Sequence, residues 1–260
     1  MGIRTWLGLK KKNNIYERMQ TAPEAATVTY EGIRLQVSPR TSPIDMRLYE
    51  GSDYERDVKK VIVDNLTPGA VAVDVGAHCG HHTASMLRAV GAIGTVIAIE
   101  PEPERFSLLQ QSFGPFKNVH LFQAGLSSQE GVASLYSEVG VSAKIVDARA
   151  DHTTQVNMTS LPVIMEQCKI AQIDLLKMDI EGHECEAIVG LAPVIRQIKA
   201  MVIEIHTEMI REQYGERKLD EMLDILAVYP KVIDLRTGRR LASLAKKVKR
   251  KDRRQVLLTF

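Results

Sequence analysis

Short apolar runs alternate with helical patterns along the chain from residue 70 onward. The runs lack regularly spaced polar positions, which is typical of strands covered on both faces of a parallel sheet. Strands that alternate with helices form βαβ units with right-handed crossovers. The predicted strands are 70–74, 95–100, 118–124, 173–179 and 200–206, and the predicted helices are 81–90, 103–113, 183–189 and 218–228.

Two further apolar runs, 231–235 and 255–260, also predict strands. The connection between them is too short for a crossover helix, so one of the two should run antiparallel to its neighbour. The whole pattern predicts a doubly wound, mostly parallel α/β sheet with helices on both faces.

Residues 1–50 show little helical or strand period, and we predict a short N-terminal extension to a single domain over 51–260. Within the extension, 27–30 and 33–37 are predicted to form a hairpin around Glu31-Gly32.

A helix is predicted from Ser52, because Ser52 and Glu55 have the spacing of a capping box. Pro68-Gly69 should end it. Residues 132–136 and 156–161 look extended, and the insert between them, including 138–154, matches no pattern. The apolar face of the predicted helix consists of Tyr54, Val58, Val61, Ile62 and Leu66.

The composition is that of a globular protein, with 260 residues of which 45% are hydrophobic. No apolar run reaches the roughly 18 residues of a membrane span, and the first residues do not have the pattern of a signal peptide. The three cysteines lack zinc-type spacing and are interpreted as reduced thiols. These features predict a cytoplasmic protein without stable membrane insertion, and they leave formation of a homo-oligomer open.

The net charge of +2 is unevenly spread, because residues 236–254 hold ten Lys or Arg residues and one acid. This segment is either a solvated loop or an anion-binding patch for a phosphorylated substrate, nucleic acid or a membrane surface. Near the N-terminus, Trp6, Leu7 and Leu9 followed by Lys10–Lys12 could contact a membrane surface.

A nucleotide site is predicted where the first central strand ends. Gly76 and Gly80 flank a tight strand-to-helix turn, which lets the backbone approach a ligand closely. Glu100 ends the next strand, 26 residues after Asp74, where a carboxylate can bind a ribose diol. Alternatively, the glycines only shape the turn and Glu100 is a surface charge.

The spacing of this turn disfavours a dinucleotide. The loop reads G-x-x-x-G after an acid rather than G-x-G-x-x-G, and Asp74 would repel a pyrophosphate. An acid there suits a ligand with an amino group. His78, Cys79, His81 and His82 could form a metal cluster, but a loop that packs on the ligand with one histidine lining the pocket is favoured.

These motifs resemble the FkbM-type S-adenosylmethionine (SAM)-dependent methyltransferases over about residues 70–206. The resemblance rests on VDVGAHCGHHT, AIEPEPERFSLLQQ, NVHLFQAGLSS, LLKMDIEGHECEAIVGL and IEIH. It implies a class I, Rossmann-like fold with a seven-stranded sheet whose last strand is antiparallel, and O-methylation of sugars, glycans or small natural products.

The resemblance also implies cofactor-binding positions. SAM would contact Asp74, Gly76 and Gly80 on its methionine side, with His78, where the family usually has Asn, in the same loop. Glu100 would hold the ribose. Residues 123–126, with Ala124 and Gly125, would border the adenine, and Asp179 would also reach the cofactor.

The chemistry is expected beyond the carboxyl ends of two later strands. Asp179 and Glu181 follow one, and Glu204 and His206 end the next. A hydroxyl acceptor must lose its proton, so we predict His206 as the first candidate general base, Asp179 as the second and Glu181 as a further catalytic group. In an alternative, Asp179, Glu181 and Glu204 hold Mg²⁺.

Two features bear on the substrate. Lys177 is interpreted as the partner of a nearby carboxylate. The sequence Asp179-Ile-Glu-Gly replaces the Asn/Asp-Pro-Pro-aromatic turn of many amine methyltransferases, so an oxygen acceptor on a small molecule or glycan is favoured. The alternatives are an RNA methyltransferase that uses 236–254, although few aromatic residues there could stack on bases, and a non-catalytic nucleotide-binding module.

Overall fold

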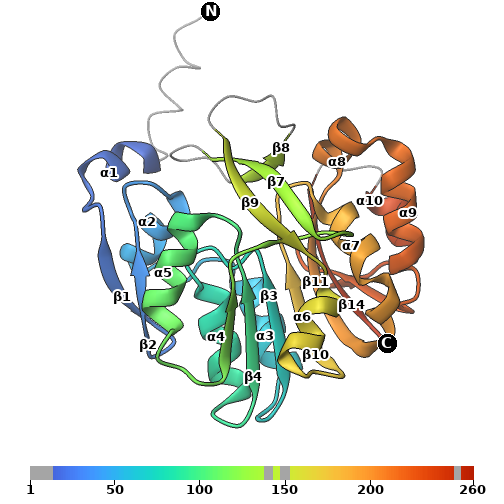
Figure 1. Cartoon of the computed structure of the whole chain (residues 1–260), viewed down its shortest axis with the longest axis horizontal. Helices are drawn as coiled ribbons and strands as arrows, with labels where there is room; N and C mark the ends of the chain where they lie inside the picture. The colour runs from blue at the N-terminus through green and yellow to red at the C-terminus, as the bar shows by residue number, and fades with distance from the viewer. Residues whose placement is uncertain (1–13, 138–142, 147–152, 249–252) are drawn as a thin grey trace, which may run out of the picture.

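A mostly parallel sheet forms the centre of the protein (Figure 1). The computed structural model describes residues 14–137, 143–146, 153–248 and 253–260. The described strands of this sheet follow the order β13-β12-β14-β11-β10-β3-β4-β5. They are β3 (Val71–Val75), β4 (Thr95–Ile99), β5 (Val119–Phe122), β10 (Ile173–Met178), β11 (Ile198–His206), β12 (Lys231–Asp234), β13 (Arg239–Arg240) and β14 (Arg253–Thr259).

The sheet confirms the doubly wound α/β prediction. Strands β5, β4, β3, β10 and β11 pair in parallel, and β14 lies antiparallel between β11 and β12. The two-residue strand β13 adds an eighth, short strand at the edge. The predicted seven-stranded sheet with one antiparallel strand is therefore present.

Helices cover both faces because successive side chains of the central strands point to opposite sides. Val73 belongs to the apolar cluster under α6, α7 and α9, whereas Ala72 belongs to the cluster under α3, α4 and α5. Neither face is left to water, which explains the lack of polar alternation. The helices are α3 (Arg56–Asn65), α4 (His81–Val90), α5 (Pro103–Phe113), α6 (Leu161–Cys168), α7 (Glu184–Leu191) and α9 (Glu216–Leu226).

The N-terminal extension is folded onto the second of these clusters. The predicted hairpin is present as β1 (Ala26–Tyr30) and β2 (Ile33–Val37), turning through Glu31 and Gly32 with positive φ. The sequence did not predict α1 (Ile15–Thr21) or α2 (Pro43–Tyr49). The side chain of Ser42 caps α2 by accepting hydrogen bonds from the amides of Ile44 and Asp45.

The predicted capping box at Ser52 is wrong. Helix α3 begins at Arg56, and Glu55 precedes it in a left-handed conformation with φ 52°. Its carboxylate does not cap the helix; it contacts His82 and Gln255 instead. Glu55 therefore belongs to the site described below.

A second sheet lies beyond the carboxyl ends of the central strands (Figure 1). Residues 132–136 and 156–159 are extended as predicted and pair antiparallel within it. Its described strands are β6 (Gly125–Leu126), β7 (Gly131–Tyr136), β8 (Lys144–Val146) and β9 (Thr153–Thr159).

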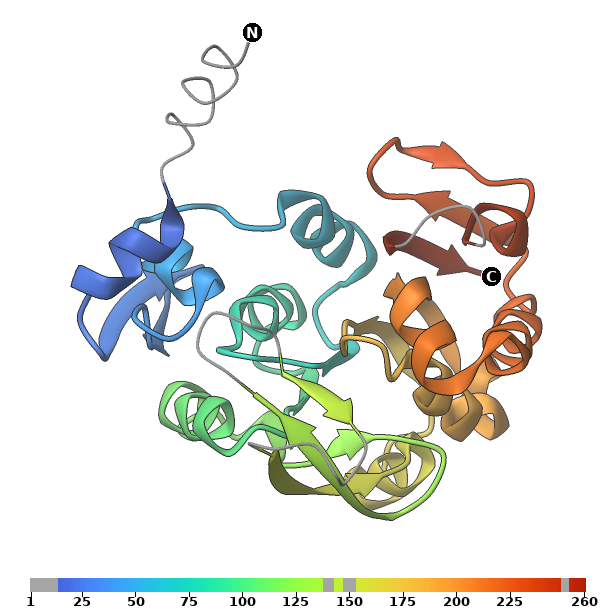
Figure 2. The same ribbon diagram turned by 90° about the horizontal axis from the view of Figure 1, so that it is seen from above.

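Three described elements remain, the 3₁₀ helix η1 (Ala192–Gln197), α8 (Thr207–Tyr214) and α10 (Leu244–Val248). Figure 2 shows the N-terminal elements at one end of the molecule and β12–β14 at the other. None of the described helices is both long and apolar enough to cross a bilayer. Some residues on which predictions were based lie outside the described residues. They are Trp6, Leu7, Leu9 and Lys10–Lys12, residues 138–142 and 147–152 of the insert, and 249–252 of the basic segment.

We predict that the extension unfolds together with the main domain. Leu35 in β2 is fully buried in the cluster shared with α4 and α5. Leu35→Ala should lower the free energy of unfolding by about 2–5 kcal/mol in a single denaturation transition. The exposed Val132→Ala control should leave stability unchanged. Loss of the hairpin with no shift of the main transition would show instead that 1–50 is an independent unit.

Candidate active site

A cavity of about 510 Å³ opens beyond the carboxyl ends of β3, β4, β10 and β11. This volume lies within the roughly 300–1,000 Å³ of small-molecule sites. The position is the one at which open α/β sheets bind ligands. Its wall includes Gly76, His78, Glu100, Ala124, Gly125 and Asp179, which the sequence had predicted, and Thr41, Arg47, Tyr54, Glu55, Lys144 and Arg253, which it had not.

The turn after β3 lies directly against the end of β10. Gly76 has φ 74°, and a Cβ there would lie 2.0 Å from the carbonyl oxygen of Asp179. Lys177 Nζ ties the same turn to β10 by donating a 2.8 Å hydrogen bond to the carbonyl of Gly76. Only glycine permits this approach, so the cavity floor depends on it.

Gly80 has a different role from the one predicted. It begins α4 with φ 90°, and a Cβ there would lie 2.3 Å from the ring of Phe113. It therefore allows α4 to pack against α5. Within the described residues, Gly80 is outside the cavity wall.

Asp74 is fully buried beneath the turn, also outside the described cavity wall. Its carboxylate accepts a 2.7 Å hydrogen bond from Thr83 Oγ1 and lies 3.2 Å from Lys177 Nζ. Burial opposes its ionisation, but the Lys177 ammonium holds the pKa of Asp74 below its usual value. Lys177 is thus the carboxylate partner that the sequence predicted, and Asp74 supports the turn from behind.

Glu100 lies in the cavity wall at the end of β4 and is 6% exposed. Its two oxygens accept hydrogen bonds from the amides of His78, at 2.8 Å, and Glu102, at 3.0 Å. Burial raises the pKa of Glu100 to about 7, although both amides lower it. The carboxyl is fixed in place and presents its edge to the cavity.

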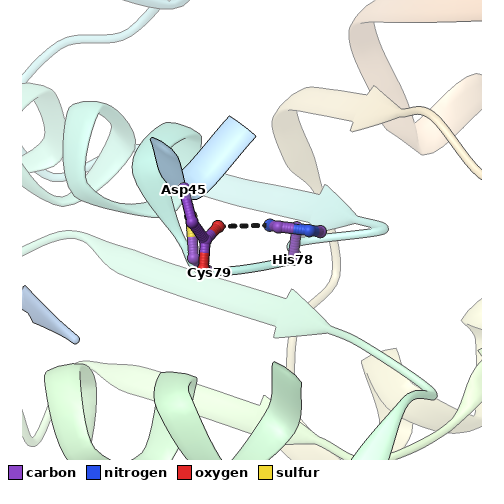
Figure 3. A group of neighbouring side chains, drawn as sticks. All are labelled: Asp45, His78 and Cys79. Carbon is purple, nitrogen blue, oxygen red and sulfur yellow. Dashed lines mark ion pairs between the residues drawn. The ribbon is translucent and has the colours of Figure 1, made fainter. Parts of the chain in front are cut away.

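His78 is held by the N-terminal extension. Figure 3 shows the side chains of Asp45 and His78 pointing toward one another, with Cys79 beside Asp45. Asp45 Oδ1 lies 3.3 Å from His78 Nδ1, and Arg105 donates a 3.1 Å hydrogen bond to Asp45 Oδ2. Burial lowers the pKa of His78 to about 3, so the imidazole is neutral.

The four residues His78, Cys79, His81 and His82, for which a metal cluster was the less favoured interpretation, are divided between two groups. His78 and Cys79 group with Asp45, whereas His81 and His82 group with Glu55. The sequence did not reveal either carboxylate partner, because both come from segments far from the loop. Glu55 had been assigned to a helix cap.

The ends of β10 and β11 bring Asp179, Glu181 and Glu204 to one side of the cavity. Arg253 of β14 bridges two of them, at 3.0 Å from Glu181 and 3.0 Å from Glu204. The guanidinium supplies the positive charge at the position predicted for Mg²⁺, so the structure gives no support to that prediction. Gln255 also donates a 3.0 Å hydrogen bond to Glu204.

Asp179 lines the cavity, and its Oδ1 lies 3.9 Å from His206 Nε2. Its Oδ1 is buried and finds no hydrogen-bond partner among the described residues. Burial raises the pKa of Asp179 to about 7; Lys177 opposes this shift, and Glu204 adds to it. A carboxylate with a pKa near neutrality in a cavity wall is suited to proton transfer.

His206 is poorly placed to act as the predicted general base. Its ring is 3% exposed and lies outside the described cavity wall. Nδ1 lies 2.7 Å from Glu184, and Nε2 lies 3.2 Å from Glu181. Burial alone would lower the pKa of His206, but Glu184 and the other carboxylates raise it to about 9. The protonated ring therefore organises the acids, and the geometry favours Asp179 over His206 as base.

The basic segment 236–254 is partly built into the fold. Arg254 pairs with the buried Asp234 of β12, and Arg253 pairs with the acids of the cavity. These two arginines are therefore part of the sheet rather than of a solvated loop.

Comparison with known proteins identifies the family. The methyltransferase FkbM domain matches residues 74–232, which is more than half of the chain. The chain belongs to the FkbM methyltransferase family. The match covers the turn after β3, Glu100, Asp179 and Glu204. It confirms the family resemblance that the sequence motifs indicated.

Two characterised proteins are similar to this chain at low sequence identity. The hexuronic acid methyltransferase AglP of Haloferax volcanii is 24% identical over 159 residues, 58% of this chain and 62% of that protein. The chain thus matches less than two thirds of AglP. The 2-O-methyltransferase NoeI of Sinorhizobium fredii is 21% identical over 66% of this chain and 76% of that protein.

Two solved structures are similar to this chain at low sequence identity. An FkbM methyltransferase from Methylobacillus flagellatus is 15% identical over 77% of this chain and 50% of that chain, with a TM-score of 0.44. A structure described as a putative rRNA methylase from Clostridium thermocellum is 13% identical over 78% of this chain and 93% of that chain, with a TM-score of 0.47.

We predict that His206 stabilises the fold only while it is protonated. Because its pKa is raised above the ordinary value, this contribution is full below pH 6.5 and is lost as the pH rises through about 9. The free energy of unfolding of the native chain should exceed that of His206→Gln by up to about 3 kcal/mol at low pH. Denaturant titrations between pH 6 and 10 measure the difference. A difference independent of pH, like that expected for the exposed His120→Gln control, would contradict the assignment.

Proposed function

We propose that the protein is a SAM-dependent O-methyltransferase that acts on a hydroxyl of a saccharide or similar polyhydroxylated molecule. The observation that carries the proposal is the convergence of four strand ends on one cavity, with Glu100 and Asp179 in the same wall. Family membership supports the reaction class. The names of AglP and NoeI support an oxygen acceptor on a sugar.

The residues fit an adenosyl ligand. The Glu100 carboxyl can accept hydrogen bonds from a ribose diol, and Ala124 and Gly125 add a small, apolar surface to the same cavity for a base. The turn at Gly76 forms the floor between Glu100 and Asp179. Bound SAM supplies an electrophilic methyl group on a positively charged sulfur. Asp74, buried behind the turn, would act on the cofactor through Lys177 and the turn rather than by direct contact.

Methyl transfer is an in-line displacement in which the bond from sulfur to carbon breaks as the bond from oxygen to carbon forms. Alignment of the acceptor carries much of the rate. The hydroxyl proton needs an acceptor, and the carboxylate of Asp179, which lines the cavity, can take it. His206, held by Glu184 and Glu181, positions the neighbouring carboxylates.

Other residues of the cavity wall suit a polar acceptor. The guanidinium of Arg47 lies 5.3 Å from the ring centre of Tyr54, and both residues line the cavity with Lys144. These groups combine an aromatic surface with hydrogen-bond donors. They favour a hydroxylated or acidic sugar. Two of the ten basic residues of 236–254, Arg253 and Arg254, pair with acids of the chain and are not available to bind RNA.

The first test of this proposal is the binding of S-adenosylhomocysteine. Isothermal titration should show saturable binding, and Glu100→Gln should weaken it about 10- to 100-fold through loss of charged hydrogen bonds to the ribose. Glu130→Gln, on the exposed turn before β7, is the matched control and should bind as the native chain does. Equal affinity for native and Glu100→Gln proteins would refute the ribose assignment.

The second test separates chemistry from binding. Asp179→Asn should lower kcat about 10²- to 10⁴-fold because the hydroxyl proton loses its acceptor, while S-adenosylhomocysteine affinity changes little. Transfer of labelled methyl groups to a panel of sugars and uronic acids measures the rate. Undiminished transfer by Asp179→Asn would exclude it as the base. Cofactor binding by the native chain without transfer to any acceptor would favour a non-catalytic role.

A further inference from the structure

A second group of ionisable side chains lies on the cavity beside the proposed catalytic acids. It consists of Glu55, before α3, and of His81 and His82, in the first turn of α4. The two histidines are 4% and 1% exposed. Glu55 Oε2 lies 2.8 Å from His82 Nε2 and 3.6 Å from His81 Nε2. Glu55 and His81 line the cavity.

The histidines are buried without satisfying their polar atoms. Both ring nitrogens of His81 and Nδ1 of His82 find no hydrogen-bond partner among the described residues. Each such group costs about 1–3 kcal/mol when it is left unpaired. The ring of Tyr54 packs against His81 with its centroid 5.7 Å away, which fixes the imidazole at the cavity edge. A ligand that accepts nitrogen donors would relieve this cost.

The three side chains have the geometry of a metal centre. One ligand atom from each lies within 4.8 Å of the others. Tetrahedral zinc with bonds of 2.0–2.2 Å separates its ligands by about 3.3 Å, between the 2.8 and 3.6 Å observed here. Two histidines and one glutamate, with a fourth position open, form a recurrent zinc ligand set in enzymes.

The surroundings also favour a cation. The other oxygen of Glu55 accepts a 3.1 Å hydrogen bond from Gln255, as outer partners of metal ligands do. Carboxylate oxygens of Asp179 and Glu204 lie within 4.8 Å of Glu55. The group formed by Asp45, His78 and Cys79 differs, because Arg105 already pairs with Asp45 there.

We propose that Glu55, His81 and His82 form a binding site for a divalent transition-metal ion of the zinc type, whose open coordination position faces the cavity beside Asp179. Imidazole ligands select such an ion over Mg²⁺, which requires oxygen ligands. The site itself is independent of the methylation reaction.

Its role rests on the proposed function. A cation beside Asp179 attracts the oxygen of an acceptor hydroxyl and lowers its pKa. The proton then passes from that hydroxyl to Asp179, and the oxygen forms its new bond to the methyl carbon as the bond from sulfur to carbon breaks. The metal supplies charge only, and no electron is transferred to it.

The experiment measures metal binding by the untagged, metal-stripped full chain in the absence of any nucleotide. Isothermal titration with Zn²⁺ should show one equivalent of tight binding, and Mg²⁺ should not compete. Glu55→Gln, His81→Gln and His82→Gln should each weaken Zn²⁺ binding by roughly tenfold or more. His120→Gln, an exposed histidine on β5, is the matched control and should bind as the native chain does.

Cobalt spectroscopy on the native chain tests the site without any variant, so its result does not depend on whether the variants fold. Co²⁺ loading should give the visible bands of a four-coordinate ion with nitrogen and oxygen ligands, which Zn²⁺ then abolishes. A sulfur-to-cobalt charge-transfer band would assign the ion to Cys79 and overturn the proposal. Absence of Zn²⁺ binding, or binding unchanged in all three variants, would also overturn it. S-adenosylhomocysteine titrations are read separately, so failure of the metal site is distinguishable from failure of the methyltransferase assignment.

Discussion

The site depends on the contact between the turn after β3 and the end of β10. Asp74 and Lys177 form a buried ion pair beneath this contact, and the same ammonium donates to the carbonyl of Gly76. A buried charge pair is costly unless further hydrogen bonds support it, and Thr83 donates to Asp74 while the carbonyl of Gly76 accepts from Lys177. With the turn held down, Glu100 and Asp179 can face one cavity. Asp74 contributes by fixing the floor.

Electrostatics then separates the roles of the acids. Glu181 and Glu204 share the guanidinium of Arg253, and Glu184 holds His206 in its protonated form. The Oδ1 atom of Asp179 is buried and has no hydrogen bond among the described residues, although His206 Nε2 lies 3.9 Å away. Burial raises the pKa of Asp179 to about 7 despite the opposing charge of Lys177. The charged residues at the ends of β10 and β11 thus include two cations that hold the acids in place, His206 and Arg253. They also include one carboxyl, Asp179, that can exchange a proton.

Much of the architecture could be predicted from the sequence because it follows from local patterns. Apolar runs such as 95–99 predict strands covered on both faces, and Gly76 and Glu100 stand at the ends of two such runs. The short helices α1 and α2 escaped prediction because seven residues leave little period to detect. Their stability comes from tertiary packing.

The errors at the site share one physical cause, which is that partners come from distant segments. Glu55 had the spacing of a helix cap, but its carboxylate faces His82. Arg253 belonged to a basic run that a charge pattern alone assigns to solvent. His206 was expected to be a base, but the neighbouring carboxylates, Glu184 above all, raise its pKa to about 9 although burial opposes the shift. Sequence spacing cannot reveal these neighbours, whereas the register of β14 on β11 does.

A crystal structure of the chain with S-adenosylhomocysteine would test the central claim most directly. The account predicts that the ribose hydroxyls lie within hydrogen-bond distance of Glu100, that the homocysteine part runs over the turn at Gly76, and that the sulfur faces Asp179. A ligand bound away from Glu100, or with its sulfur turned away from the ends of β10 and β11, would contradict it.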